Sequence, residues 1–157
     1  MDNRLCDGRD EAWPLFLRTY TVLLDRLEHE LQTERDMPLT WFDVLAQLEG
    51  APDGRMKMRD LADSILLSKS GVTRLVDRME RAGLIERASC ETDRRVVYAA
   101  ITDKGRKRFA SAAPVAVRGV ETYFSAPLDP SERRALMSAL DKIQSAAATR
   151  SEERAAG

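Results

Sequence analysis

Apolar and polar positions recur with helical spacing between residues 68 and 84, which have the sequence SKSGVTRLVDRMERAGL. At about 100° per residue, one arc of this helix holds four apolar side chains: Val72, Leu75, Val76 and Met79. Ser68 is placed to cap the start, and Gly83 lies where a left-handed residue commonly ends a helix. The other arc carries hydroxyls and charged groups: Lys69, Ser70, Thr73, Arg74, Asp77 and Arg81. That arc is either an ordinary solvated face or one that enters a groove of DNA.

The N-terminal part predicts two helices. Over residues 10–32, apolar residues alternate spacings of four and three, which forms a continuous stripe on one long helix: Trp13, Leu17, Tyr20, Leu24, Leu27 and Leu31. The sequence MPLT then breaks the chain. Thr40 with Asp43 resembles a capping arrangement for a second helix that continues to about Gln47.

The middle of the chain predicts a helix-turn-helix with a hairpin beside it. Residues 56–58 form a possible short strand, and residues 59–65 a short helix that shares an apolar face with the helix after Ser68. Residues 84–88 and 96–101 then form two short strands around the polar turn SCETDRR. At the tip of this hairpin, Asp93 can hold one of two arginines, Arg94 and Arg95, in position for a minor groove or for phosphates.

Two more helices are expected at the C-terminal end. Thr102 can cap the first, in which Pro114 should cause a bend or an interruption. Asp129, Pro130 and Glu132 form a strong start signal for the second, whose stripe is Leu136, Leu140 and Ile143. The tail after residue 148 has little to bury, so we expect it to be disordered.

Charge is unevenly distributed along the 157 residues, whose formal net charge is −1. Residues 55–109 hold 14 Lys plus Arg against 8 Asp plus Glu, whereas the remainder holds 11 against 18. A basic segment around the suspected groove-binding helix supports a polyanionic partner. The sequence has no apolar run long enough for a membrane span or signal peptide, so we expect a cytoplasmic protein. Its two cysteines, Cys6 and Cys90, suggest neither a metal site nor a disulfide framework.

The segment MRDLADSILLSKSGVTRLVDRMERAGLIERASCETDRRVVYAAITDKG resembles the MarR family of winged helix-turn-helix transcriptional regulators. The resemblance extends in plan over roughly residues 10–146, and its most specific parts are SGVTRLVDRMERAGLIER and DRR followed by ITDKG. It implies a mainly α fold with a small β-hairpin wing, and a homodimer joined through long N- and C-terminal helices. It also implies a palindromic double-stranded DNA operator. We expect a repressor of that operator, with activation as the open alternative, and no cofactor.

The expected organisation has five parts. Residues 1–9 form a flexible N-terminus, 10–50 the N-terminal dimerisation and support helices, and 51–103 the winged helix-turn-helix. Residues 104–148 form the C-terminal dimerisation helices, and 149–157 the disordered tail. We expect the DNA-binding residues to be Ser68, Lys69, Ser70, Thr73, Arg74, Arg78, Asp93, Arg94 and Arg95. Of these, Arg74 could fork to a guanine or hold a phosphate, and Arg78 could contact a phosphate or another part of the chain. By the resemblance, Arg95 enters the minor groove and Arg94 contacts the DNA backbone.

A small phenolic or aromatic ligand is the effector that the resemblance implies. Five residues could line its cleft, although large aromatic residues are more often plain core: Trp13, Phe16, Arg18, Trp41 and Phe42. An alternative is an oxidant-sensing regulator that reacts through Cys6 or Cys90, and a less favoured one is a helical dimerisation module that does not bind DNA. The sequence has a single histidine and no set of Cys, His or carboxylate residues at ligand spacing, so it does not favour an enzyme or a metal site.

Overall fold

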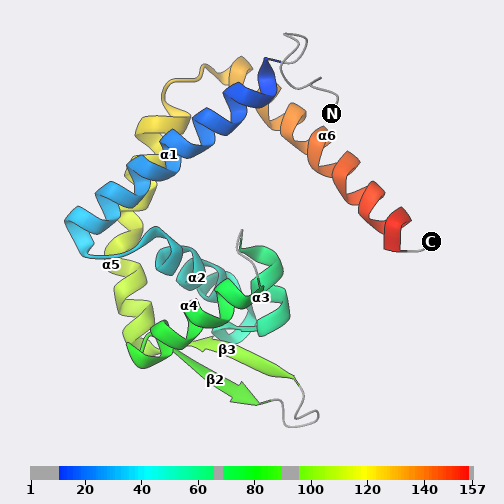
Figure 1. The fold of residues 1–157 in the computed structure, drawn as a ribbon. Coiled ribbons are helices and arrows are strands. Elements are labelled where there is room, and N and C mark those ends of the chain that lie inside the picture. The colour runs from blue at the N-terminus through cyan, green and yellow to red at the C-terminus, as the bar shows by residue number, and fades with distance from the viewer. Residues whose placement is uncertain (1–10, 66–68, 90–95, 156–157) are drawn as a thin grey trace. The chain divides into compact units, whose positions relative to one another are not determined.

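The computed structural model describes residues 11–65, 69–89 and 96–155, with side chains for all of these except 69, 70 and 149–155 (Figure 1). It divides into two compact units, residues 1–118 and 119–157, which are described separately. In the first unit the elements are α1 (Ala12–Arg35), α2 (Leu39–Gly50), a 3-10 turn (Pro52–Gly54), β1 (Arg55–Lys57), α3 (Met58–Ser64), α4 (Lys69–Arg81), β2 (Ile85–Ser89), β3 (Val97–Ile101) and most of α5 (Asp103–Val120). The second unit contains a π-helical turn (Glu121–Ser125) and α6 (Pro130–Ala155). The predicted class, mainly α with a small β-hairpin, is confirmed.

The three strands form one antiparallel sheet in the order β1-β3-β2. Arg87 of β2 and Met56 of β1 both lie opposite Ala99 of β3. The predicted hairpin of β2 and β3 is therefore confirmed. The suspected short strand is confirmed as β1, the third strand of the sheet, and it begins one residue earlier than expected. Through this pairing the residues before α3 are attached to the hairpin, so that α3, α4 and the wing form one lobe.

The core of the lobe contains the apolar arc that the helical periodicity predicts for α4. Val72, Leu75, Val76 and Met79 are each at most 2% exposed. They pack in one cluster with Leu45 and Leu48 of α2, Leu61 of α3, and residues of the sheet and α5. Because each such side chain contributes about 1.5–3 kcal/mol when it leaves water, this cluster fixes which face of α4 points outward.

The C-terminus of α4 has the geometry that Gly83 predicts. Gly83 has φ +71°, its N–H donates to the Glu80 carbonyl at 2.8 Å, and the Leu84 N–H donates to the Met79 carbonyl at 3.0 Å. This pair of hydrogen bonds is the Schellman motif, for which glycine carries no steric penalty. The chain therefore leaves α4 abruptly and enters β2.

The start of α2 differs from the prediction. The helix begins at Leu39 after Pro38, and no side chain of its own caps it, so Thr40 lies inside the first turn. Glu28 of α1 takes over the role, since its Oε2 accepts the Leu39 N–H at 2.7 Å. Because the capping carboxylate lies eleven residues earlier, on another helix, no local sequence signature indicates it. The predicted cap by Thr40 and Asp43 is therefore wrong.

The start of α5 is capped as predicted. Of the two effects predicted for Pro114, the interruption is wrong and the bend stays a prediction. Thr102 Oγ1 accepts the Gly105 N–H at 3.0 Å. Pro114 lies inside α5 without ending it, and the helical hydrogen bonding changes to the π form only at Glu121. One missing N–H thus costs this helix less than the packing of Ala112, Val115 and Ala116 against the core gains.

In the second unit, Asp129 caps α6 as predicted. Its Oδ1 accepts the N–H groups of Ser131 at 2.6 Å and Glu132 at 2.9 Å, and Glu132 Oε2 accepts the Asp129 N–H in return. The Ser131 hydroxyl, which donates to the same oxygen at 2.6 Å, and the two backbone N–H groups lower the pKa of Asp129, because they favour the charged carboxylate. The tail differs from the prediction: α6 continues to Ala155, since its Ala, Glu and Arg residues are good helix formers even without burial.

Candidate nucleic-acid interface

The face of α4 opposite the core presents hydroxyl and guanidinium groups to solvent. Thr73, Arg74, Arg78 and Arg81 are all exposed. The backbones of Lys69 and Ser70 form the first turn of α4, as predicted, while their side chains lie outside the described part. Ser68 of the expected set also lies outside the described residues, as do Asp93, Arg94 and Arg95 at the hairpin tip. The structure therefore places Thr73, Arg74 and Arg78 on one exposed helix face and leaves the wing contacts as predictions.

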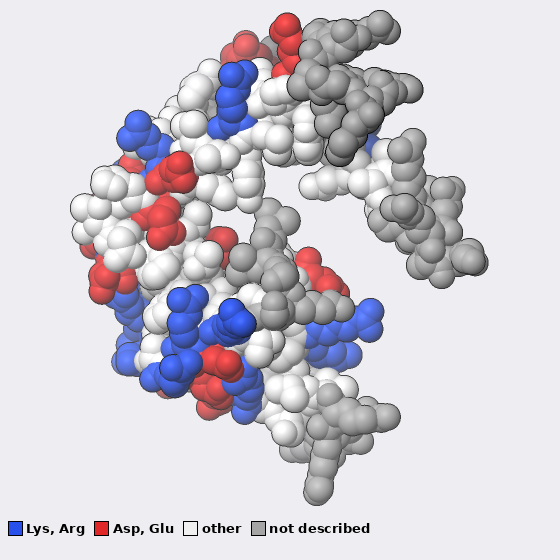
Figure 2. All heavy atoms as spheres, viewed as in Figure 1, with Lys and Arg blue, Asp and Glu red and all other residues white. Residues whose placement is uncertain are grey.

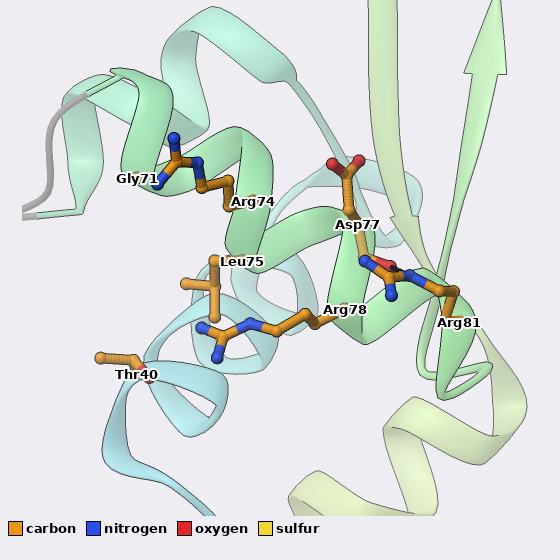
Figure 3. A pocket seen from close by; sticks show the side chains of 7 residues that line it. All are labelled: Thr40, Gly71, Arg74, Leu75, Asp77, Arg78 and Arg81. Carbon is orange, nitrogen blue, oxygen red and sulfur yellow. Dashed lines mark hydrogen bonds between the residues drawn. The ribbon is translucent and has the colours of Figure 1, made fainter.

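A groove of about 560 Å³ follows this face (Figure 3). Arg74, Arg78 and Arg81 line it from α4, together with Leu75 and Asp77, and Thr40 lines it from the first turn of α2. In Figure 3, the side chain of Arg78 extends from α4 toward Thr40. The groove thus joins the exposed face of α4 to a segment more than thirty residues earlier, a connection that the sequence did not indicate.

The arginines of the groove differ from most others in the same unit in having no acidic partner. Arg106 pairs with Glu49 and Arg118 with Glu34. Among the described residues, Arg74 and Arg78 form no ion pair, and Arg81 donates only to the backbone carbonyl of Asp77, at 3.2 Å. Positive charge that is not neutralised within the lobe therefore gathers over α4, where Figure 2 shows Lys and Arg side chains with a few acidic ones between them.

The acidic residues of α4 are held on the side of the wing. Arg87 of β2 donates to Asp77 Oδ1 at 2.5 Å and to Glu80 Oε2 at 2.6 Å, and its backbone N–H donates to Glu80 Oε1 at 3.2 Å. These contacts raise the pKa of Arg87, chiefly through the hydrogen bond to Asp77. The network fixes β2 against α4, and its one guanidinium offsets part of the charge of the two carboxylates. Sequence reasoning missed Arg87, whose only signal was the pair of acidic residues on an otherwise basic helix.

The end of α4 is also tied to the start of α5. Thr102 Oγ1 donates to the Gly83 carbonyl at 2.7 Å, and Lys104 Nζ donates to the Ala82 carbonyl at 2.7 Å. A helix C-terminus leaves such carbonyls unsatisfied, so these two side chains complete it. Gly105 allows the close approach, because a Cβ at this position would lie 2.1 Å from the Leu84 carbonyl oxygen. Helix α4 is therefore held by its buried core face, at its C-terminus and along the side that faces the wing, and the face that carries the arginines is open to solvent.

Known proteins share this architecture. AbsC, a MarR family transcriptional regulator from Streptomyces coelicolor, is 31% identical to the chain and superposes with a TM-score of 0.84 over 91% of this chain and 96% of that one. The sequence model of the MarR family matches residues 35–96, which contain α2, β1, α3, α4 and β2. The chain belongs to the MarR family.

Two other proteins similar to the chain are regulators of transcription. Sco3205 from Streptomyces coelicolor, whose structure was solved in complex with DNA, is 27% identical, with a TM-score of 0.79 over 84% of this chain and 82% of that one. The transcriptional repressor MprA from Escherichia coli is 28% identical over 87% of this chain and 85% of its own length. The matches to three regulators from Bacillus subtilis cover only 57–66% of those proteins.

The residues expected to line an effector cleft of this MarR-family chain form two separate groups. Trp13 and Phe16 stack at 6.0 Å between ring centroids and are 47% and 48% exposed, and Arg18 is exposed on the same helix. Trp41 and Phe42 are half-buried against the core of the lobe, where Phe42 stacks on Phe109. Trp13 precedes Glu28, which contacts α2, by about 22 Å of helix. Within one chain the two groups do not meet.

The described residues hold two further negative findings. No group of three or more His, Cys, Asp or Glu side chains within them could hold a metal ion. None of the helices in the same ranges is both long and apolar enough to cross a bilayer. Cys6 and Cys90, the residues of the oxidant-sensing alternative, lie outside the described part of the chain.

Proposed function

We propose that this MarR-family chain is a homodimeric repressor that binds a palindromic operator through α4 and the hairpin. The observation that carries the proposal is the exposed face of α4, whose arginines Arg74 and Arg78 have no acidic partner among the described residues. A helix that is fixed in a lobe and carries free guanidinium groups has the size and chemistry to enter the major groove. Sco3205, which shares this fold at 27% identity, was crystallised with DNA.

In this proposal Thr73 and Arg74 contact base edges together with Lys69 and Ser70, whereas Ser68 caps the helix. At the hairpin tip, Asp93 positions Arg95 for the minor groove and Arg94 contacts the backbone. These roles rest on the exposed position of α4 and on the resemblance of the DRR turn. Repression, as in the relative MprA, and a cytoplasmic location belong to the same proposal.

Homodimer formation is supported by apolar side chains that the chain leaves exposed. On α1, Leu15 and Val22 are 59% and 57% exposed, and on α6, Met137 and Ile143 are each 65% exposed. Exposed apolar surface on this scale marks an interaction site. A second copy would bury it and would place two α4 helices on two operator half-sites, about one turn of DNA apart.

The effector belongs to the same proposal: a small phenolic or aromatic ligand that binds near Trp13, Phe16, Arg18, Trp41 and Phe42 and relieves repression. Because the two aromatic groups do not meet within one chain, a ligand that contacts both must use residues of both copies. Such a ligand would change DNA affinity by binding one arrangement of the dimer better than the other.

Selection of bound sequences from a randomised duplex library tests the proposal. Wild-type protein should enrich a palindrome and bind it as a dimer. Arg74→Ala should cost about 1–3 kcal/mol on that sequence and relax the preference at one base pair of each half-site. Arg95→Ala should weaken binding at the flanks. A folded dimer that enriches no sequence would contradict operator recognition.

A further inference from the structure

The groove beside α4 has features of a second DNA contact, separate from the base-reading residues. It is bounded on one side by Arg74, Arg78 and Arg81 of α4 and on the other by Thr40 of α2 (Figure 3). At 100° per residue, Arg78 lies about 40° beyond Arg74 around the helix. Its side chain points across the groove toward α2 rather than outward along the base-reading face. The two arginines are thus directed at different places.

The charge in the groove favours an anion. Asp77 is the one acidic residue among those that line it, and its carboxylate already accepts a hydrogen bond from Arg87 at 2.5 Å. Arg78 forms no ion pair among the described residues. The opposite wall is the first turn of α2, where Thr40 lines the groove and the Leu39 N–H already donates to Glu28 Oε2 at 2.7 Å. The positive charge that favours an anion in this groove therefore comes from the three arginines of α4.

The shape of the groove favours an extended anion over a small aromatic one. The three arginines that line it are exposed, and its one large apolar residue, Leu75, is only 2% exposed, so the floor offers little surface for an aromatic ring. The cations follow α4 over seven residues, or about 10 Å. Phosphates of one DNA strand recur every 3.4 Å or so along the duplex axis, so such a row can meet more than one of them.

We propose that this groove seats the sugar-phosphate backbone of one DNA strand, with Arg78 as a phosphate contact and the Thr40 hydroxyl facing the same strand. The proposal rests on the proposed DNA-binding function and gives two arginines of α4 different contacts with the DNA. Arg74 reads bases from the centre of the exposed face, whereas Arg78 holds the strand beside it. Phosphate contacts fix the register of a protein on the duplex without carrying sequence information themselves.

The test compares Arg78→Gln and Arg74→Gln with Arg134→Gln, which removes an exposed cation from α6. Fluorescence anisotropy measures the affinity of each full-length protein for the selected sequence and for an unrelated duplex of equal length, at several salt concentrations. We expect Arg78→Gln to weaken binding to both duplexes by the same factor, about tenfold for each half-site. The slope of log K against log salt should become less negative by about 0.9 for each lost contact.

Three results would contradict the proposal that this groove seats the DNA backbone. Arg78→Gln could leave the affinity and the salt slope unchanged, it could relax the preference at a single base pair while the slope stays constant, or Arg134→Gln could reproduce its whole effect. Thermal unfolding of Arg78→Gln should match wild type, because Arg78 has no partner in the described structure to lose.

Failure of the proposed operator function is distinguishable from failure of the groove. If wild-type protein prefers no sequence but Arg78→Gln still lowers its non-specific affinity and salt slope, operator recognition fails and the groove stands. If wild type binds no duplex at all, both proposals fail.

Discussion

Helices α4 and α6 each carry an apolar stripe, and the structure treats the two stripes differently. The stripe of α4 is buried within its own lobe, where Val76 and Met79 are 0% exposed. On α6, Leu136 and Leu140 are only half-buried, and Ile143 is 65% exposed. The two stripes therefore have different outcomes: the stripe of α4 is buried by the chain itself, whereas the stripe of α6 leaves apolar surface that a partner can cover.

The same contrast extends to polar groups. The end of α4 is completed by Thr102 and Lys104 of α5, and its acidic residues are held by Arg87 of β2. The start of α6 is completed by its own residues, Asp129 and Glu132. The orientation of α4 is thus fixed from several elements at once, as the proposed base-reading role requires, whereas α6 is a locally specified helix whose apolar side we propose as an assembly surface.

The largest effect on the lobe should come from Gly105→Ala. A Cβ at this position would meet the Leu84 carbonyl oxygen at 2.1 Å and Ile101 at 2.8 Å, and the backbone carbonyl cannot rotate away. We expect a loss of about 3 kcal/mol or more in the free energy of unfolding, and weaker DNA binding because α4 shifts. Urea denaturation measures the loss. Gly50→Ala, whose Cβ would meet nothing within 4 Å, is the control and should cost nothing. Equal stability of the two variants would contradict the close approach of Gly105 to the Leu84 carbonyl.

The next effect should appear in assembly. Ile143→Glu places a charge on the exposed stripe of α6 and should weaken association of two copies by about 30- to 100-fold, the equivalent of one buried aliphatic side chain. Sedimentation equilibrium measures the dissociation constant. Ser138→Glu adds the same charge about 140° around the helix and should have little effect. A wild-type protein that sediments as a monomer, or equal effects of both variants, would remove the role assigned to this stripe.

A smaller loss is expected from Arg87→Met. Arg87 is 29% exposed and its partners Asp77 and Glu80 about 40%, so solvent screens the network and the cost should be about 1–2 kcal/mol. DNA affinity should fall further than stability does, because the wing and α4 lose their common anchor and two carboxylates become free beside the groove. Arg59→Met, which removes a highly exposed pair with Asp63, is the control and should cost less than about 0.5 kcal/mol. If Asp77→Asn costs the same in wild type as in Arg87→Met, the two residues are not coupled.

Features that depend on neighbouring residues could be predicted from the sequence. The arc Val72, Leu75, Val76 and Met79 follows directly from helical periodicity, and Gly83 and Asp129 act on backbone groups within a few residues of themselves. The missed features are long-range. The cap of α2 by Glu28, the contacts of Arg87 with α4, and the closure of the groove by Thr40 all depend on packing between elements. The candidate face was therefore predictable, but the groove beside it was not.

The smallest predicted effect concerns Asp43, the residue expected to share in capping α2. Partial shielding from water and the nearby charge of Glu28 raise its pKa above the usual 3.8. The folded protein therefore binds this proton more tightly than the unfolded chain does. Ionised Asp43 lowers stability at neutral pH, and the loss is recovered as the pH falls through the raised pKa.

Asp43→Asn should consequently stabilise the protein at pH 7 by no more than about 0.5 kcal/mol, because Asp43 is still largely exposed. The gain should vanish below about pH 4, where both proteins are uncharged at this position. Thermal unfolding across this pH range measures it, with Asp25→Asn on the exposed side of α1 as the control for net charge. A gain that persists unchanged in acid would exclude the proton on Asp43 as its cause.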